Sequence, residues 1–220
     1  MDRIPEPELM NGPDQARAYA QADFEGPNRM FVDLFKQFFP GFQRGTVLDL
    51  GCGPADICLR LAREFPAIQV YGVDGAPNML DFARKAIAEQ NLSERVILVE
   101  GVLPGLHLPE ARFDAIISNS LLHHLKDPQA LWKTVCQAAG PETAVLIMDL
   151  LRPATEAEAR AIVQRYSGNE PDILRQDFYN SLLAAYSLEE VQEQLRRASL
   201  STLAVEVVSD RHFAVRGVLR

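Results

Sequence analysis

The chain has 220 residues, and its 22 basic and 30 acidic side chains give a formal net charge of -8. Hydrophobic residues make up 47% and charged residues 24% of the sequence, which is typical of one folded domain with a substantial core. This composition excludes a disordered, collagen-like or disulfide-dense chain. An acidic chain without a basic run also argues against a nucleic-acid partner, because phosphate binding requires clustered lysine and arginine.

Cys52, Cys58 and Cys136 show no paired spacing, which favours a reducing compartment. The first residues lack the apolar core of a signal peptide, and no apolar run approaches the roughly 18 residues of a membrane span. We therefore expect a cytoplasmic protein, a monomer or homodimer, that does not associate with a membrane.

Two helices are predicted near the N-terminus, over residues 14–25 and 30–39, after an irregular arm rich in proline and glutamate. From Thr46 onward, short apolar runs alternate with amphipathic helical segments. The predicted strands of this region cover residues 46–50, 68–73, 95–100, 113–118 and 143–149. Strands that alternate with helices in this way predict a parallel sheet that is covered on both faces.

After Asp149 this alternation stops. Helices are predicted over residues 155–166, 172–185 and from 187 onward, and the first and third begin with capping-box spacing. Two strands are expected at the end of the chain, over residues 201–208 and 211–218. The two-residue link between them predicts a hairpin, so the last strand should be antiparallel.

The most informative segment is VLDLGCGPAD, residues 47–56, in which Gly51 and Gly53 lie between a strand and a helix. Such a loop lets a ligand approach the backbone closely. A dinucleotide site would have a third glycine where this chain has Asp56, and carboxylates at Asp56 and Asp49 would repel a pyrophosphate. S-adenosylmethionine has no phosphate and carries a sulfonium and an ammonium group, so these charges favour it over NAD.

Asp74 ends the second predicted strand, where a carboxylate can accept hydrogen bonds from both ribose hydroxyls. NAD sites and S-adenosylmethionine sites both use a ribose-binding carboxylate at this position, so Asp74 alone does not distinguish them. An aspartate at a strand end can also cap a helix without binding a ligand. Together with the glycine loop, Asp74 favours a ribose-binding role.

Three segments, VLDLGCGPAD, YGVDGAPNML and FDAIISNSLLHHLKDP, resemble successive motifs of class I S-adenosylmethionine-dependent methyltransferases of small-molecule type, over about residues 46–151. The resemblance implies a Rossmann-like, doubly wound α/β fold with a seven-stranded, mostly parallel sheet. Its strand order would be 3-2-1-4-5-7-6, with strand 7 antiparallel and with helical lid elements. The implied cofactor is S-adenosyl-L-methionine.

The resemblance also implies a set of cofactor-binding residues: Asp49, Gly51, Cys52, Gly53, Asp74, Gly75, Met79, Gly101, Val102 and Asn119. In this set Asp74 would bind the ribose, and Asn119 would face the methionine or the reactive methyl group. The family often has an aspartate in place of Val102, so this chain lacks one acceptor for the adenine amino group.

His123 and His124 allow either a catalytic or a packing role. If the acceptor must lose a proton, His123 is the candidate catalytic base. The segment LLHHLKDP also resembles a common structural segment of the family, and this resemblance favours a packing role for both histidines. Adjacent helical residues point in different directions, and the fourth strand ends in Ser118-Asn119 without an acid. We therefore expect no metal site.

A single domain with four segments is expected: an N-terminal helical arm or lid (1–45), a cofactor-binding core (46–151), a helical insertion (152–186), and a closing helix with a β-hairpin (187–220). Substrate selection should come from outside the sheet, and the candidate acceptor-binding residues are Tyr19, Phe24, Arg152 and Tyr179. Helix packing is the alternative role for each. Residues 14–25 and the insertion are expected to cover the acceptor as a lid.

The expected reaction is methyl transfer to an O, N or S nucleophile of a small molecule. Nucleic-acid methyltransferases would carry an Asn/Asp-Pro-Pro-aromatic segment where this chain has residues 118–121. Two alternatives stay open: a non-catalytic S-adenosylmethionine-binding or regulatory protein of the same fold and, disfavoured by Asp56, a nicotinamide-dependent oxidoreductase.

Overall fold

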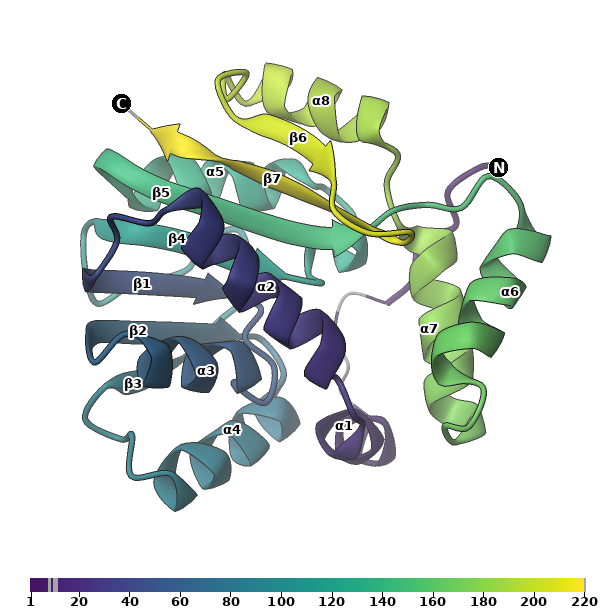
Figure 1. The fold of residues 1–220 in the computed structure, drawn as a ribbon, viewed down its shortest axis with the longest axis horizontal. Coiled ribbons are helices and arrows are strands. Elements are labelled where there is room, and N and C mark those ends of the chain that lie inside the picture. Colours follow the sequence, from purple (N-terminus) through teal and green to yellow (C-terminus); the bar gives the residue numbers. More distant parts are fainter. Residues whose placement is uncertain (8, 10–11, 220) are drawn as a thin grey trace.

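The computed structural model describes residues 1–7, 9 and 12–219. Within these residues, seven strands form one sheet in the order β3-β2-β1-β4-β5-β7-β6 (Figure 1). The strands are β1 (Arg44–Leu50), β2 (Ala67–Asp74), β3 (Val96–Glu100), β4 (Phe113–Asn119), β5 (Ala139–Leu150), β6 (Ala204–Val207) and β7 (His212–Leu219). All pairs are parallel except those of β7, which runs antiparallel to β5 and β6. The predicted Rossmann-like fold and strand order are confirmed.

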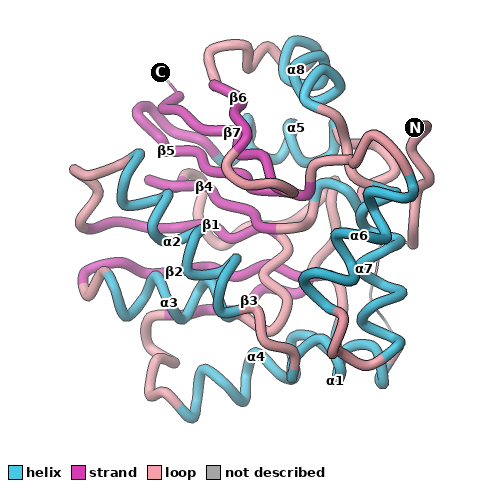
Figure 2. The backbone as a smooth tube through the Cα atoms, turned by 45° about the vertical axis from the view of Figure 1, so that its right-hand side comes forward, coloured by secondary structure: helices cyan, strands magenta, loops and turns pink. Residues whose placement is uncertain are grey.

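Helices cover both faces of the sheet and its carboxyl edge. They are α1 (Pro13–Gln21), α2 (Glu25–Phe38), α3 (Asp56–Glu64), α4 (Pro77–Glu89), the 3-10 helix η1 (Leu122–His124), α5 (Gln129–Ala138), α6 (Glu156–Ser167), α7 (Asp172–Ala184) and α8 (Leu188–Arg197). Helices α2, α3 and α4 pack on one face, and α5 and α8 pack on the other. Figure 2 shows α1, α6 and α7 beyond the carboxyl ends of the parallel strands.

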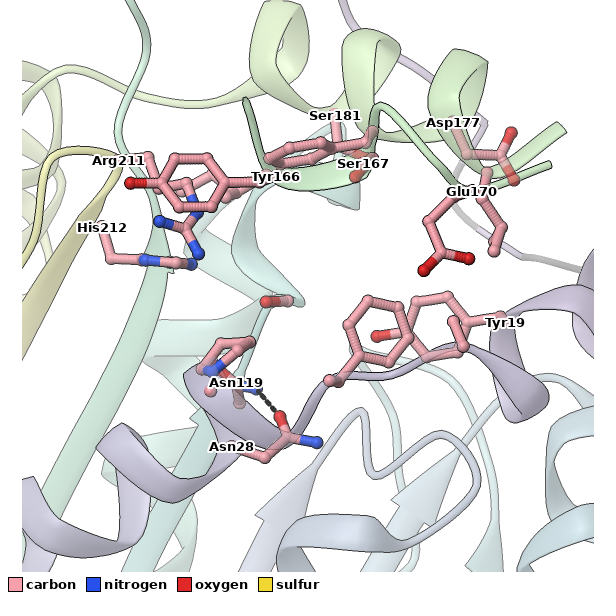
Figure 3. Close-up of a pocket in the computed structure, with 18 of the residues that line it drawn as sticks. Tyr19, Asn28, Asn119, Tyr166, Ser167, Glu170, Asp177, Ser181, Arg211 and His212 are labelled. Carbon is pink, nitrogen blue, oxygen red and sulfur yellow. Dashed lines mark hydrogen bonds between the residues drawn. The ribbon is translucent and has the colours of Figure 1, made fainter. Parts of the chain in front are cut away.

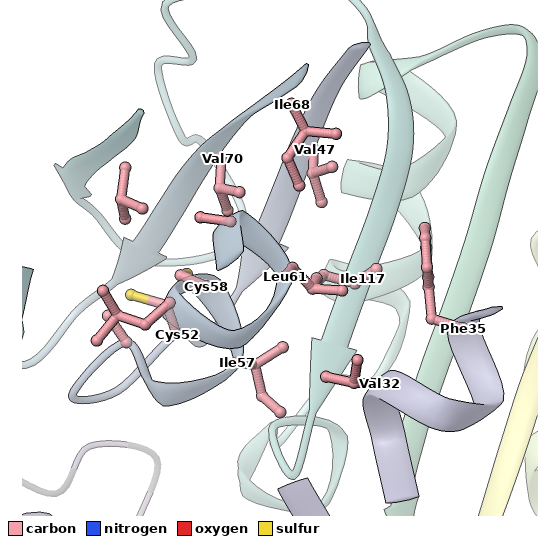
Figure 4. Close-up of a cluster of buried hydrophobic side chains, with 14 of the residues drawn as sticks. Val32, Phe35, Val47, Cys52, Ile57, Cys58, Leu61, Ile68, Val70 and Ile117 are labelled. Carbon is pink, nitrogen blue, oxygen red and sulfur yellow. The ribbon is translucent and has the colours of Figure 1, made fainter. Parts of the chain in front are cut away.

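Alternation along β1 divides its side chains between the two apolar layers. Val47 packs in the layer under α2 and α3, where Figure 4 shows it near Ile68 and Val70. Leu48 and Leu50 pack in the opposite layer. Successive strand residues point to opposite faces, so a strand that is buried on both sides reads as a continuous apolar run. This layering leaves the loop after Leu50 at the open edge of the sheet.

The N-terminal helices differ from the predicted ranges 14–25 and 30–39. Helix α1 ends at Gln21, and α2 begins at Glu25, five residues earlier than predicted. The Asp23 carboxylate accepts the Glu25 amide at 2.9 Å and so closes the turn between the helices. Pro27 is tolerated in the first turn of α2, because an amide there has no partner within the helix.

The C-terminal segment follows its predicted capping pattern more closely. Ser187 and Glu190 form the reciprocal capping box that their spacing predicts. The Thr155 hydroxyl accepts the Glu158 amide and so caps α6. The Glu158 carboxylate accepts the Ala154 amide instead of the Thr155 amide that a capping box requires. Strand β6 is shorter than the predicted 201–208. In the described part of the chain, no helix combines the length and the apolar character needed to cross a membrane.

Candidate functional site

A cavity of about 330 Å³ lies at the carboxyl ends of β1, β2 and β4. Eight residues of the predicted cofactor set line it: Gly51, Gly53, Asp74, Gly75, Met79, Gly101, Val102 and Asn119. Parallel α/β sheets bind their ligands at this edge. We call this space the first cavity.

The glycine loop at the floor of the first cavity is tied to the end of β2. The amides of Gly51 and Cys52 both donate to the Val73 carbonyl, at 2.8 and 2.9 Å. Gly51 and Gly53 have φ values of +75° and +52°, a backbone region in which a side chain is strained. The loop therefore presents backbone rather than side chains to the cavity.

Asp74 is oriented by the same loop. One carboxylate oxygen, Oδ2, accepts the Gly53 amide at 2.8 Å, and Oδ1 accepts the Ala76 amide at 2.8 Å. Burial raises the pKa of Asp74, although its backbone hydrogen bonds act in the opposite direction. Each oxygen keeps a further lone pair, so the carboxylate can accept hydroxyl groups from a ligand in the cavity.

Two residues of the predicted cofactor set lie beneath the loop and do not line the first cavity. The Asp49 carboxylate is buried and accepts the Cys58 thiol, with Oδ2 to Sγ at 3.1 Å. Burial raises the pKa of Asp49 to about 7. The Cys52 side chain is also buried, and both it and Cys58 lie against Gly72.

The titration of Asp49 predicts how stability depends on pH. Its folded-state pKa is raised, so the stability that the protonated group provides is complete below the unfolded-state pKa of about 4. That stability is lost as the pH rises toward the folded-state pKa of about 7. Asp49→Asn does not titrate, so its melting temperature relative to the wild type should be higher at pH 8 than at pH 4. Asp81→Asn, an exposed change on α4, is the control, and a pH-independent difference for Asp49→Asn would contradict the burial argument.

A second cavity of about 410 Å³ adjoins the first (Figure 3). It lies between the α1–α2 turn and the α6–α7 pair, and it shares Tyr19, Asn119, Ser120 and His124 with the first cavity. The two spaces therefore meet just after the end of β4. We call this space the second cavity.

The predicted acceptor-binding residues divide into two pairs. Tyr19 and Phe24 line the second cavity, with their ring centroids 4.6 Å apart. Arg152 and Tyr179 line neither cavity. Arg152 pairs with Glu190 at 2.9 Å, and the Tyr179 hydroxyl donates to Glu156 at 3.1 Å.

A chain of hydrogen bonds from α3 determines how Asn119 is oriented. Arg60 Nε and Asn28 Nδ2 both donate to Asp56 Oδ2 at 2.6 Å. An ionised carboxylate only accepts, so the Asn28 amide nitrogen must face Asp56 and its Oδ1 must face Asn119. Asn119 Nδ2 donates to that oxygen at 3.4 Å. Asn119 Oδ1 is left buried, without a partner among the described residues.

This chain of contacts has two consequences for the predictions from sequence. Asn28 belongs to the site although no motif indicated it, because an asparagine within an apolar helix has no recognisable pattern. Asp56 is paired with Arg60, which also pairs with Glu25, so its negative charge at the glycine loop is partly compensated. The charge argument against a pyrophosphate therefore depends less on Asp56 than the sequence predicted.

His123 is buried and is held between two carboxylates. Its Nδ1 lies 2.5 Å from Asp149 Oδ1, and its Nε2 lies 3.4 Å from Glu6 Oε1. Burial opposes a charge on this imidazole, but Asp149 and Glu6 outweigh burial and raise the pKa of His123. Asp149 also accepts the Leu122 and Leu150 amides, each at 2.7 Å. Glu6 was not indicated by any sequence pattern.

The expectation of no metal site assumed that His123 and His124 diverge, and this assumption was wrong. Their ring centroids are 4.2 Å apart, although the two residues are adjacent in the single-turn 3-10 helix η1. One donor atom from each of Glu6, His123 and His124 lies within 4.8 Å of the others. These atoms already take part in polar contacts: His124 Nδ1 lies 3.3 Å from Glu6 and 3.4 Å from the Pro7 carbonyl. The prediction of no metal site now rests on these contacts.

Comparison with known proteins supports the same family. Residues 47–142 match a methyltransferase domain family. The chain is 30% identical over 142 residues to a 2-phytyl-1,4-naphtoquinone methyltransferase of Nostoc punctiforme, covering 64% of this chain and 61% of the relative. It is 32% identical over 109 residues to a demethylmenaquinone methyltransferase of Lactobacillus johnsonii, covering 48% and 44%. The chain thus spans less than two thirds of these relatives' length.

The fold is also found in solved structures. A SAM dependent methyltransferase from Aquifex aeolicus superimposes with a TM-score of 0.66 at 19% identity, covering 94% of this chain and 98% of that one. This likeness shows the shared fold. The strand order, the glycine loop at the sheet edge and the sequence matches together support the class I S-adenosylmethionine-dependent methyltransferase family for this chain.

Proposed function

We propose that the protein binds S-adenosylmethionine in the first cavity and methylates an O, N or S nucleophile of a small molecule in the second. The observation that carries this proposal is that the two cavities meet beside Asn119, Ser120 and His124. When bound, the cofactor supplies an activated methyl group: the nucleophile's lone pair bonds to the methyl carbon as the carbon–sulfur bond breaks, and sulfur keeps the electron pair.

The described residues fit such a cofactor. Asp74 offers two oriented oxygens for ribose hydroxyls, and the Gly51–Gly53 loop leaves backbone-lined space for the methionine part. Asn119 Oδ1 is a buried acceptor that needs a donor, and the α-ammonium group can provide one. Met79 and Val102 provide apolar surface for the adenine.

On the acceptor side, we assign His123 to take the proton from an acceptor that still carries one, a step that requires the neutral imidazole and is therefore favoured above the raised pKa of His123. Asp149 orients the ring and stabilises the imidazolium that results. An acceptor that is already ionised, such as a thiolate, needs no base. The α1–α2 turn and the α6–α7 pair act as the lid that excludes water from the second cavity.

Calorimetry with S-adenosylmethionine, S-adenosylhomocysteine and NAD tests the cofactor assignment. We expect the first two to bind and NAD not to bind. Incubation with thiols, phenols, amines and carboxylic acids, followed by measurement of released S-adenosylhomocysteine, tests turnover. Binding without release from any acceptor class would favour the non-catalytic alternative, and tight NAD binding would contradict the proposal.

The reaction is expected to need no added metal, because Glu6, His123 and His124 are engaged with one another, with Asp149 and with the Pro7 carbonyl. Methyl transfer should therefore be unchanged after exhaustive treatment with EDTA, and the purified protein should contain no stoichiometric metal by mass spectrometry. Loss of activity in EDTA that zinc or magnesium restores would show that these side chains are metal ligands.

The glycine loop offers a selective test of cofactor binding. A Cβ at Gly53 meets no atom within 4 Å, whereas one at Gly51 would lie 2.9 Å from Leu121 Cβ. We expect Gly53→Ala to weaken S-adenosylmethionine binding more than about tenfold, with a backbone cost to folding of only about 1–2 kcal/mol. Gly51→Ala should lower the melting temperature further. Normal cofactor affinity in Gly53→Ala would place the methionine part elsewhere.

The lid assignment predicts separable effects for two neighbouring rings. Phe24 lines only the second cavity, whereas Tyr19 lines both. Phe24→Ala should raise KM for the acceptor and leave S-adenosylhomocysteine affinity unchanged, and Tyr19→Ala should change both quantities. Deletion of residues 1–25 is less selective, because Arg3 and Ile4 bond to the carbonyls of residues 184 and 183 in α7. Equal losses of cofactor affinity in the two point variants would contradict the lid.

A further inference from the structure

Three carboxylates line the second cavity, and they come from three different segments. Asp23 lies in the α1–α2 turn, Glu170 between α6 and α7, and Asp177 in α7. Figure 3 shows the Glu170 carboxylate pointing into the cavity toward Tyr19. Within the described part of the chain, Glu170 has no ion-pair partner. Asp177 accepts the neutral amide of Gln15 at 2.9 Å, and it has no ion-pair partner among the described residues. Glu170 and Asp177 are therefore not paired with a cation.

The basic groups of the same cavity do not offset this charge. Arg211 pairs with Asp210 at 3.1 Å, and its guanidinium lies 3.4 Å from the centroid of the Tyr166 ring. Burial lowers the pKa of His124 to about 3 and that of His212 to about 4, so both rings are neutral near pH 7. His123 is held between Asp149 and Glu6. The cavity as a whole is therefore negative.

Aromatic rings line both sides of this negative space. Tyr19 and Phe24 are adjacent on the arm side, and Phe178 lies on the insertion side. Aromatic faces attract organic cations through their quadrupole, and the attraction grows when the cation is desolvated. Rings and carboxylates together suit an organic cation.

We propose that the methyl acceptor carries a positively charged amine, which binds between the Tyr19–Phe24 ring pair and the carboxylates of Glu170 and Asp177. This inference rests on the proposed function, because it takes the second cavity as the acceptor site. A carboxylate or phosphate ligand would be repelled by the uncompensated acids. A neutral ligand that displaced water would leave those acids desolvated without a partner, which is costly. Glu170 and Asp177 therefore determine specificity.

The test uses two probes of equal shape and different charge, choline and 3,3-dimethylbutan-1-ol. Each is titrated by calorimetry into the full-length protein saturated with S-adenosylhomocysteine. We expect choline to bind at least about tenfold more tightly than its uncharged isostere. The preference should fall below about threefold in the Glu170→Gln/Asp177→Asn double variant, because Coulomb attraction is removed while shape is kept.

Asp172→Asn is the matched control, because Asp172 lies on the same helix as Asp177, has a side chain 98% exposed and lines neither cavity. It should keep the full preference. Melting temperature and S-adenosylhomocysteine affinity show that each variant is folded. Equal or weaker binding of choline, or a preference that survives in the double variant, would overturn the inference. Failure of S-adenosylhomocysteine to bind the wild type would instead contradict the proposed function, so the two failures are distinguishable.

Discussion

Asp74→Ala is expected to weaken S-adenosylmethionine binding by about 1.5–3 kcal/mol, or roughly ten- to 150-fold, the usual range for hydrogen bonds to a charged group. The amides of Gly53 and Ala76 hold the two carboxylate oxygens at 2.8 Å, so the group is oriented before the ribose arrives. The alanine variant removes the ribose acceptor and also frees the Gly53 amide. Isothermal titration calorimetry of the folded variant measures the loss.

Asp74→Asn separates these two effects. Asparagine can keep one oxygen as an acceptor for a backbone amide, but it has no charge and its second position is a donor. Its loss of affinity should be smaller than that of Asp74→Ala. Asp81→Asn is the control on α4, where the aspartate is exposed and pairs with Arg84. Unchanged affinity in a folded Asp74→Ala protein would show that the ribose lies elsewhere.

Asp149→Ala should produce the largest loss of stability, about 3–5 kcal/mol, because it leaves the charge on buried His123 without its closest partner. It also removes the acceptor of the Leu122 and Leu150 amides. Urea denaturation measures this loss of unfolding free energy. Asp149→Asn keeps the shape of the side chain, and it replaces Asp149→Ala in these measurements if the alanine variant does not fold. Methyl transfer to an acceptor that must lose a proton should fall in both variants.

The pH dependence of this loss follows from the two opposite pKa shifts. Burial opposes ionisation of Asp149, but His123 outweighs burial and lowers the carboxyl pKa, so its contribution is lost as the pH falls through the folded-state pKa. The pKa of His123 is raised, so its contribution is lost as the pH rises through its folded-state value. The difference between wild type and Asp149→Asn should therefore be greatest between about pH 4 and 6.5.

A double-mutant cycle of His123→Gln and Asp149→Asn isolates the pair. The double variant should lose less stability than the sum of the two single variants, because neither charge is then buried alone. Strict additivity at pH 6 would show that the two side chains do not stabilise each other, and it would remove the basis for the assigned role of His123.

Local spacing in the sequence was enough to predict a parallel sheet with an antiparallel last strand and the position of the glycine loop, whereas the strand order came from the resemblance to the methyltransferase family. The apolar runs of β1, β2 and β4 are buried on both faces, so each is recognisable without its neighbours. Gly51, Gly53 and Asp74 follow directly from these strand ends, which the topology brings to one edge. The capping box at Ser187 is equally local, because all of its hydrogen bonds lie within four residues.

Contacts between distant segments decided the rest. Glu6 contacts His123, and Asn28 contacts Asp56 and Asn119. These residues are far apart in the sequence, and no periodic pattern predicts that they meet. The rings of His123 and His124 lie 4.2 Å apart and tilted by 35°, a contact that the pattern of two adjacent histidines does not specify. Burial and polar partners set the direction in which a side chain points and the charge it carries. The sequence by itself therefore determined the fold and the loop at the sheet edge, and only the tertiary structure decided which polar groups meet in the two cavities.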